Sequence, residues 1–192
     1  MSLLRSKVEI RAATLAARDA LSPEQLDADA VAVAARGLPF AVATGAVVAG
    51  YAPIRSEFDP MPLLRKLADA GARLALPVIM GRGLPLQFRS FSFGQALVRG
   101  PLGILQPPAA AAELIPDILL VPLAAFDRSG HRIGYGAGYY DRSIEALRNR
   151  NRTMAVGLAF AAQEIDAIPA QPHDAALDYV LTEARTFDFR RK

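Results

Sequence analysis

Hydrophobic and polar positions change their spacing along the chain, and these changes predict helices and strands in turn. Residues 2–20 are rich in Leu, Ala and Arg and contain neither Gly nor Pro, which favours a helix. Ser22, followed by Pro23 and then by Gln25, is the start signal of a second helix with a capping box, and this helix should end near Arg36. Glycine and proline residues after Arg36 predict a turn that leads into a buried strand.

The rest of the chain continues this alternation. Strands are predicted at 45–51, 73–79, 86–91, 115–123, 153–160 and 178–182, and helices at 59–71 and 139–150. The run 115–123 is almost continuously apolar, as expected of a central parallel strand. Residues 95–113 show no clear period, so we expect a long loop or lid there. Strands that alternate with helices predict an α/β fold, a single three-layer α/β/α domain over residues 1–192, Rossmann-like, with a mostly parallel sheet.

The composition narrows the class of protein. The 192 residues are 52% hydrophobic and 21% charged, which is typical of a soluble globular protein. The absence of cysteine excludes disulfides, thiolate metal sites and a cysteine nucleophile. With only His131 and His173, a histidine-rich metal site is excluded as well, whereas a Ser–His–Asp triad that uses one of them stays open.

Charge gives little direct information about partners. Arginine supplies 19 of the 22 basic residues, and the net charge is +3. No long block of like charge occurs, so charge alone does not predict nucleic-acid binding. The charge-free stretch 37–54 is interrupted by Gly and Pro, and the N-terminal segment has no apolar core, so neither a membrane span nor a signal peptide is predicted. We expect a cytoplasmic monomer that binds neither membranes nor nucleic acid.

The strongest chemical signal is the segment 126–142, which joins a buried strand to a helix. It carries Gly134, Gly136 and Gly138 at alternate positions, preceded by Arg132. Glycines let backbone N–H groups approach an anion, and ligands of open α/β sheets bind at the carboxyl ends of strands. We therefore predict a phosphate site, with a plain tight turn as the alternative. The spacing matches neither the P-loop nor the dinucleotide fingerprint, so the loop alone leaves the reaction open.

Other charged residues are placed to share that ligand. Lys7, Arg11 and Arg18 lie within roughly 40° of one another on a helical wheel. Three like charges on one stripe favour an anionic partner such as a polyphosphate, and a solvated face is the alternative. Asp141 follows the glycine loop and either holds Mg²⁺ beside a phosphate or complements the helix dipole. Glu57 follows the first strand and is, by itself, an ordinary loop residue.

Nine segments together resemble one known family. They are Lys7-x-x-x-Arg11, Arg18-x-x-Leu21-Ser22, Tyr51-x-Pro53-x-x-x-Glu57, Pro101-Leu102-Gly103-Ile104, and residues 122–127, 132–142, 156–163, 169–174 and 178–183. In this order they are similar to the 5-formyltetrahydrofolate cyclo-ligases over nearly the whole chain. The glycine loop that ends in Tyr139-Tyr140-Asp141-Arg142 is the most specific of them.

The resemblance implies an ATP- and Mg²⁺-dependent enzyme. Such an enzyme converts 5-formyltetrahydrofolate to 5,10-methenyltetrahydrofolate and releases ADP and phosphate. In this family the formyl oxygen attacks the γ-phosphate, and N10 of the folate then closes the ring as phosphate leaves. No protein nucleophile is needed, so catalysis consists of positioning and charge stabilisation.

The same resemblance implies roles for residues at matching positions. ATP would contact Lys7, Arg11, Arg132, Ile133, Gly134, Tyr135, Gly136, Ala137, Gly138, Tyr139 and Tyr140. The folate would contact Ala52, Glu57, Tyr135, Gly136, Ala137, Gly138 and Tyr139, with Glu57 bonded to the pterin. Arg132 and Tyr139 would be catalytic, Asp141 and Asp174 would hold Mg²⁺, and Gln163 is a further candidate. Ala137 replaces the glycine or lysine often found at its position, so a lysine contribution is absent there.

Two other functions remain open. The first is a phosphate- or CoA-ester-binding α/β enzyme that does not use ATP, which would need its own base or nucleophile beside the glycine loop. The second is an arginine-rich RNA-binding module, which requires aromatic residues among the basic ones. Apart from Phe88, Phe91 and Phe93, the aromatic residues are not placed in that way.

Overall fold

Helices and strands alternate along the chain in a computed structural model that describes residues 6–171 and 174–190. The helices are α1 (Lys7–Asp19), α2 (Pro23–Arg36), α3 (Met61–Asp69) and α4 (Tyr139–Arg148), with 3₁₀ helices η1 (Pro101–Gly103) and η2 (Ala161–Gln163). The strands are β1 (Val47–Ala49), β2 (Arg73–Val78), β3 (Gln87–Phe91), β4 (Val98–Arg99), β5 (Leu105–Gln106), β6 (Ile118–Pro122), β7 (Ala125–Phe126), β8 (Arg132–Ile133), β9 (Met154–Leu158), β10 (Tyr179–Leu181) and β11 (Thr186–Asp188). The start predicted for the first helix, at residue 2, lies outside the described residues.

Seven strands form one sheet in the order β11-β10-β9-β6-β1-β2-β3. The five inner strands are parallel, and the edge strands β3 and β11 run antiparallel to their neighbours. The mostly parallel α/β sheet predicted from the sequence is thus confirmed. From β1 the chain passes through α3 to β2 on one side, and later returns to β6 on the other side of β1. This reversal creates a switch point at the carboxyl ends of β1 and β6, where ligands of open α/β sheets bind.

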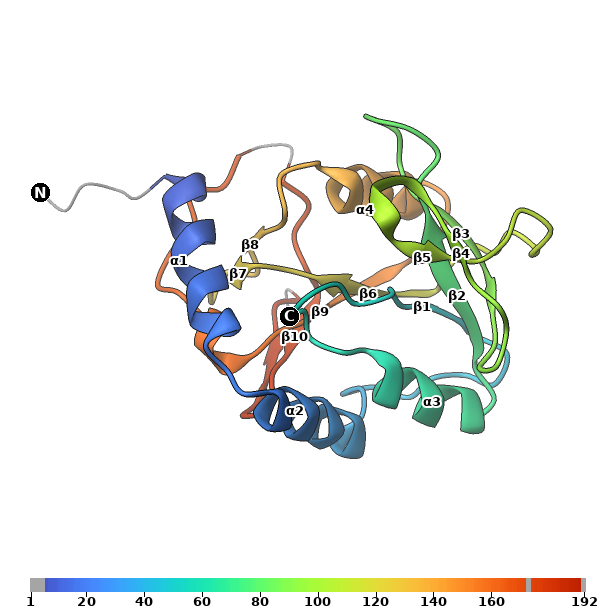
Figure 1. Ribbon diagram of the computed structural model, residues 1–192, viewed down its shortest axis with the longest axis horizontal. Coiled ribbons are helices and arrows are strands. Elements are labelled where there is room, and N and C mark those ends of the chain that lie inside the picture. The colour runs from blue at the N-terminus through green and yellow to red at the C-terminus, as the bar shows by residue number, and fades with distance from the viewer. Residues whose placement is uncertain (1–5, 172–173, 191–192) are drawn as a thin grey trace, which may run out of the picture.

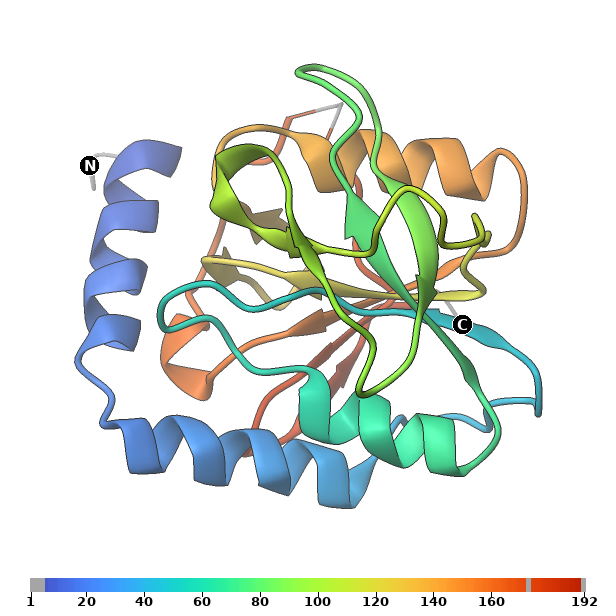
Figure 2. The ribbon, with the colours of Figure 1, turned by 45° about the vertical axis from the view of Figure 1, so that its right-hand side comes forward.

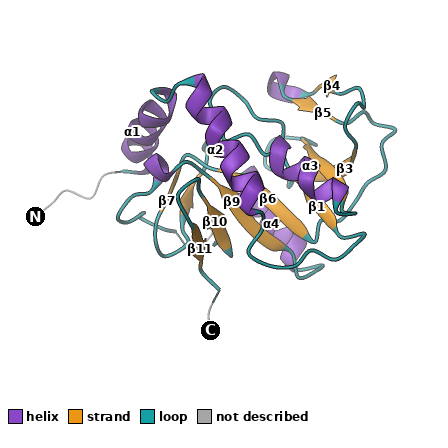
Figure 3. Ribbon diagram, turned by 90° about the horizontal axis from the view of Figure 1, so that it is seen from below, coloured by secondary structure: helices purple, strands orange, loops and turns teal. Residues whose placement is uncertain are grey.

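Successive strand residues face opposite sides of the sheet, and each side packs against different helices. Val48 and Leu120 belong to the core shared with α2 and α3, whereas Val47 and Leu119 belong to the core shared with α4. Figures 1 and 3 show the resulting three layers, with α2 and α3 on one face of the sheet and α4 on the other. The helix α1 stands across the end of the sheet (Figure 2), where its Ile10 packs in a separate small core.

The first turns of α1 and α2 are fixed by serine caps. The Ser22 hydroxyl accepts a hydrogen bond from the Gln25 N–H at 3.2 Å, as predicted. The Gln25 side chain, however, donates to Asp29 at 2.7 Å, so the reciprocal half of the predicted capping box is wrong. The complete box lies instead at the start of α1, between Ser6 and Glu9.

Ser22→Ala is expected to lower the free energy of unfolding by about 1 kcal/mol, because an N–H at the start of α2 loses its acceptor. For a chain of this size that corresponds to a fall in Tm of about 2–4 °C, measured by thermal denaturation. Ser129→Ala is the matched control, since that serine is exposed and its hydroxyl has no hydrogen bond within the described part of the chain. Equal Tm values for the two variants would contradict the prediction.

Three short pairings were not predicted. The segment 95–113, expected to be a loop, contains the hairpin β4–β5 with η1 at its tip, and Figure 2 shows this hairpin in front of the sheet. A second hairpin pairs β7 with β8, and β11 extends the sheet beyond β10. Strands of two or three residues are too short to show a period of two, which is why the pattern of apolar positions missed them.

Candidate active site at the carboxyl ends of the parallel strands

A cavity of about 690 Å³ lies at the switch point of the sheet. Its walls come from the loop after β1, the ends of β2 and β6, the glycine loop with the start of α4, one side of α1 and the hairpin β4–β5. All the residues of the predicted ATP, folate and metal sites line it, namely Lys7, Arg11, Ala52, Glu57, Arg132, Ile133, Gly134, Tyr135, Gly136, Ala137, Gly138, Tyr139, Tyr140, Asp141 and Asp174. The fold therefore brings together residues from both ends of the chain in one place.

The glycine loop joins β8 to α4 along one wall of this cavity. Gly136 and Gly138 have φ angles of 94° and 66°, in the left-handed region that favours glycine. Gly138 is the N-cap of α4, and no side chain of the described residues caps this helix. The N–H groups of the first turn of α4 consequently meet the cavity without a protein acceptor, an arrangement suited to an anion.

Arg132 and Asp141, on either side of that loop in the sequence, form an ion pair in which the arginine is buried and the aspartate is partly exposed. Arg132 is 6% exposed, and its Nη2 donates to Asp141 Oδ1 at 2.7 Å. The backbone of Ala175 completes the arrangement, since its carbonyl accepts from Arg132 and its N–H donates to Asp141. Burial lowers the pKa of the Arg132 guanidinium, and the neighbouring Asp141 charge opposes that shift. Arg132 is thus a fixed cation in the cavity wall.

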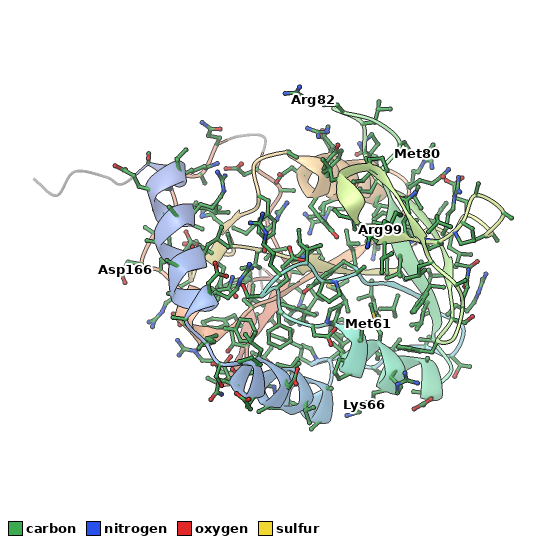
Figure 4. All side chains as sticks on the ribbon, viewed as in Figure 1. Met61, Lys66, Met80, Arg82, Arg99 and Asp166 are labelled. Atoms are coloured by element: carbon green, nitrogen blue, oxygen red, sulfur yellow. The ribbon has the colours of Figure 1, made fainter. Side chains whose placement is uncertain are left out.

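The cationic stripe of α1 faces inward. Lys7 Nζ lies 2.5 Å from Asp174 Oδ2, and Arg11 Nε donates to the Gly134 carbonyl at 2.7 Å. Arg18 is 2% exposed and donates to the Tyr135 hydroxyl at 2.5 Å, so it contacts the protein rather than the cavity. The solvated-face alternative is therefore wrong for this stripe. By contrast, Arg82 projects out of the fold between β2 and β3 (Figure 4).

Glu57 is a buried carboxylate in the cavity wall, in the loop that follows β1. It is 8% exposed and accepts the Ile54 N–H at 2.9 Å. Burial raises its pKa, while the Ile54 N–H, a hydrogen bond from Tyr135 and the charge of Arg18 pull in the other direction. A buried carboxylate with few protein donors favours a ligand that presents N–H groups.

Asp141 and Asp174, the predicted metal ligands, face the cavity as half of an ion pair each. Within residues 6–171 and 174–190, no group of three or more His, Cys, Asp or Glu side chains is placed to hold a metal ion. Mg²⁺ commonly binds through one or two carboxylates together with substrate phosphates and water. The two carboxylates therefore fit an ion that arrives with a nucleotide better than a permanently bound one.

Gln163 is not part of the cavity, which corrects its prediction as a site residue. It is 1% exposed and donates to the carbonyls of Leu123 and Ala124 at 2.7 and 3.0 Å. Its Oε1 accepts the Phe160 N–H at 2.9 Å. The side chain satisfies buried backbone groups where β6 and β9 end, so its role is structural.

Some cavity residues had no predicted role. Arg142 and Glu145 on α4, Leu102 and Ile104 on the hairpin β4–β5, and Gln171 all line the cavity. The segments that contain Leu102, Ile104 and Arg142 were recognised as motifs, but a motif does not say which side chains face a ligand. That information comes from the packing of α4 and the hairpin around the loop.

The chain is similar to known proteins over most of its length. A profile of the 5-formyltetrahydrofolate cyclo-ligase family matches residues 4–183. The 5-formyltetrahydrofolate cyclo-ligase of Mycolicibacterium smegmatis is 39% identical over 94% of this chain and 95% of its own length. That of Escherichia coli K12 is 31% identical over 90% and 97%, respectively. Among solved structures, 5,10-methenyltetrahydrofolate synthetase of Aquifex aeolicus superposes with a TM-score of 0.77 at 29% identity, over 97% of this chain and 94% of that one.

In the described residues, every helix is too short or too polar to cross a bilayer.

Proposed function

Because the chain belongs to the 5-formyltetrahydrofolate cyclo-ligase family, we propose that it catalyses the ATP-dependent closure of 5-formyltetrahydrofolate to 5,10-methenyltetrahydrofolate, with release of ADP and phosphate. The observation that carries the proposal is the shared cavity, which is lined both by the glycine loop at the uncapped start of α4 and by the buried carboxylate of Glu57. One end suits a polyphosphate and the other suits a heterocycle with N–H donors. The reaction requires both ligands to meet.

The phosphate end supplies positive charge. Lys7, Arg11 and Arg132 surround the glycine loop, whose N–H groups bind the phosphate oxygens in this proposal. Fixed donors in the cavity wall stabilise the charge that develops when the formyl oxygen attacks the γ-phosphate. Mg²⁺, held by Asp141 and Asp174 together with the nucleotide, would neutralise part of the phosphate charge.

The folate end positions the nucleophiles. Glu57 accepts hydrogen bonds from the amino and ring N–H groups of the pterin, and Ala52 and Tyr135 lie beside it in the cavity wall. Tyr139 and Tyr140, in the first turn of α4, also line the cavity. Burial, followed by the charge of Glu57, raises the pKa of Tyr140, so its phenol stays protonated and can donate a hydrogen bond to a ligand. After phosphoryl transfer, N10 of the bound folate closes the ring and phosphate leaves.

The test is direct. The protein with Mg·ATP and 5-formyltetrahydrofolate is expected to produce the absorbance of the methenyl product together with an equal amount of ADP. Loss of both signals would overturn the proposal. If sugar phosphates or CoA raised the Tm and Mg·ATP did not, the cavity would instead belong to a phosphate- or CoA-ester-binding enzyme.

We further propose that residues 1–192 act as one domain, as a cytoplasmic monomer whose partners are these small molecules. What supports a monomer is that the exposed large apolar side chains are spread over several elements: Val8 lies on α1, Val31 on α2, Met80 and Leu84 in the loop between β2 and β3, and Val98, Leu102 and Leu105 on the hairpin β4–β5. A monomer should elute in size-exclusion chromatography near 20.5 kDa.

A further inference from the structure

Two arginines of the cavity have no acidic partner among residues 6–171 and 174–190. Lys7 and Arg132 are each paired with an aspartate, whereas Arg11 and Arg142 donate only to backbone carbonyls. Arg11 reaches the loop from α1 and bonds the Gly134 carbonyl at 2.7 Å. Arg142 reaches it from α4 and bonds the Ala137 carbonyl at 2.6 Å. In the described residues, the charges of Arg11 and Arg142 are therefore not compensated by a carboxylate, and both side chains contact the glycine loop.

These two groups lie beside different glycines of the loop. Arg11 Nη1 lies 3.6 Å from the position that a Cβ atom on Gly136 would occupy. Arg142 Nη1 lies only 2.7 Å from the corresponding position on Gly138, so a side chain there would collide with it. The loop thus leaves room for a guanidinium at each of these places.

Arg142 also has an unsatisfied donor. Its Nε is buried and has no hydrogen-bond partner; in the described part of the chain, the Tyr179 hydroxyl is the other side-chain atom of this kind. A buried donor without a partner destabilises the fold, and native proteins rarely keep one without a function. The residue lines the cavity, and between Gly134 and Gly138 the loop carries no cation of its own.

We propose that Arg142 binds the polyphosphate, and that it forms with Arg11 a clamp across the glycine loop. On binding, its guanidinium leaves the Ala137 carbonyl and bonds the phosphate oxygens, which match its planar pair of donors. The inference rests on the proposed function in that the polyphosphate is taken to be that of Mg·ATP. It adds to that function a cation from α4 opposite the cation from α1.

The test uses Arg142→Ala and Arg142→Lys in steady-state kinetics. Arg142→Ala is expected to raise the KM for Mg·ATP about 10-fold, because one charge-assisted contact is lost, and to leave the KM for 5-formyltetrahydrofolate within about twofold. Arg142→Lys should recover part of this loss, since lysine keeps the charge but not the planar fork. Arg150→Ala, an exposed arginine just after α4, is the control for the change in net charge.

Calorimetric binding of inorganic tripolyphosphate separates this inference from the proposed function. The affinity is expected to fall about 10-fold in Arg142→Ala and to stay unchanged in Arg150→Ala, whether or not the wild-type protein closes the folate ring. Equal tripolyphosphate affinity in wild type and Arg142→Ala would overturn the inference. If Arg142 had a purely structural role, Arg142→Ala would instead lower the Tm and raise the KM values for both substrates. Arg142→Lys would then also lower the Tm and raise both KM values, rather than recover part of the KM for Mg·ATP.

Discussion

Asp141→Asn is expected to lower kcat about 100-fold while the protein stays folded. The asparagine Oδ1 still accepts from Arg132 and from the Ala175 N–H, so the contacts that tie the glycine loop to residue 175 persist. The negative charge is lost, however, and with it the proposed Mg²⁺ ligand. The concentration of Mg²⁺ needed for half-maximal rate should rise along with the fall in kcat.

The control for this variant is Asp178→Asn. Asp178 also pairs with an arginine of α4, Arg148, at 2.8 Å, but it lies outside the cavity. Its substitution should leave the Mg²⁺ dependence unchanged. Wild-type turnover of Asp141→Asn at every Mg²⁺ concentration would reject the metal role of this residue.

Glu57→Gln is expected to weaken folate binding and to stabilise the protein at the same time. A carboxylate accepts hydrogen bonds through two oxygens, whereas the glutamine amide has one accepting oxygen and no charge. A hydrogen bond to a charged group contributes about 1.5–3 kcal/mol. The KM for 5-formyltetrahydrofolate should therefore rise about 10- to 100-fold, with little change in the KM for Mg·ATP. Steady-state kinetics with each substrate varied in turn measure this difference.

The effect on stability follows from the raised pKa of Glu57. The folded protein holds the proton of this carboxyl at a pH where the unfolded chain has released it, because burial disfavours the charge. The free energy of unfolding therefore falls as pH rises from the ordinary value of 4.5 through the folded pKa. Glutamine does not ionise, so the Tm of Glu57→Gln should exceed that of wild type at pH 8, and the gap should close below pH 4.5.

Glu24→Gln is the control with the opposite sign. Its pKa is lowered by hydrogen bonds at the start of α2, so its charge stabilises the fold. Replacing it should lower the Tm slightly at pH 8. If the Tm of Glu57→Gln at pH 8 were equal to or below that of wild type, the predicted destabilisation by the buried charge of Glu57 would be contradicted.

Elements and site residues could be predicted from the sequence where neighbouring residues alone determine them. The apolar run at 115–123 could be read as a central strand because β6 is buried on both faces. The inward direction of Lys7 and Arg11 followed from their helical spacing and from the like charges on one stripe. The glycine loop could be recognised because closely spaced glycines are typical of a backbone that adopts positive φ angles or approaches a ligand closely.

The features that could not be predicted from the sequence depend on contacts between segments that are distant in the chain. The hairpin β4–β5 contains too few residues to show a period, and Gln163 was misjudged because its partners lie 39 and 40 residues away. Arg142 could not be assigned a role from spacing, since its partner is a backbone carbonyl and its unpaired Nε is a property of packing. Arg18 likewise donates hydrogen bonds to Ser56 and Tyr135, which are 38 and 117 residues away, so its contacts could not be predicted from spacing.

The ion pair between Lys7 and Asp174 also has a consequence for synthesis. The two residues are 167 positions apart, so the pair cannot form before the segment that carries Asp174 has been synthesised. A nascent chain that lacks its last segment carries the glycine loop and the N-terminal cations but not the carboxylate that positions Lys7. The proposed phosphate site therefore reaches the arrangement described here only after residue 174 has been synthesised.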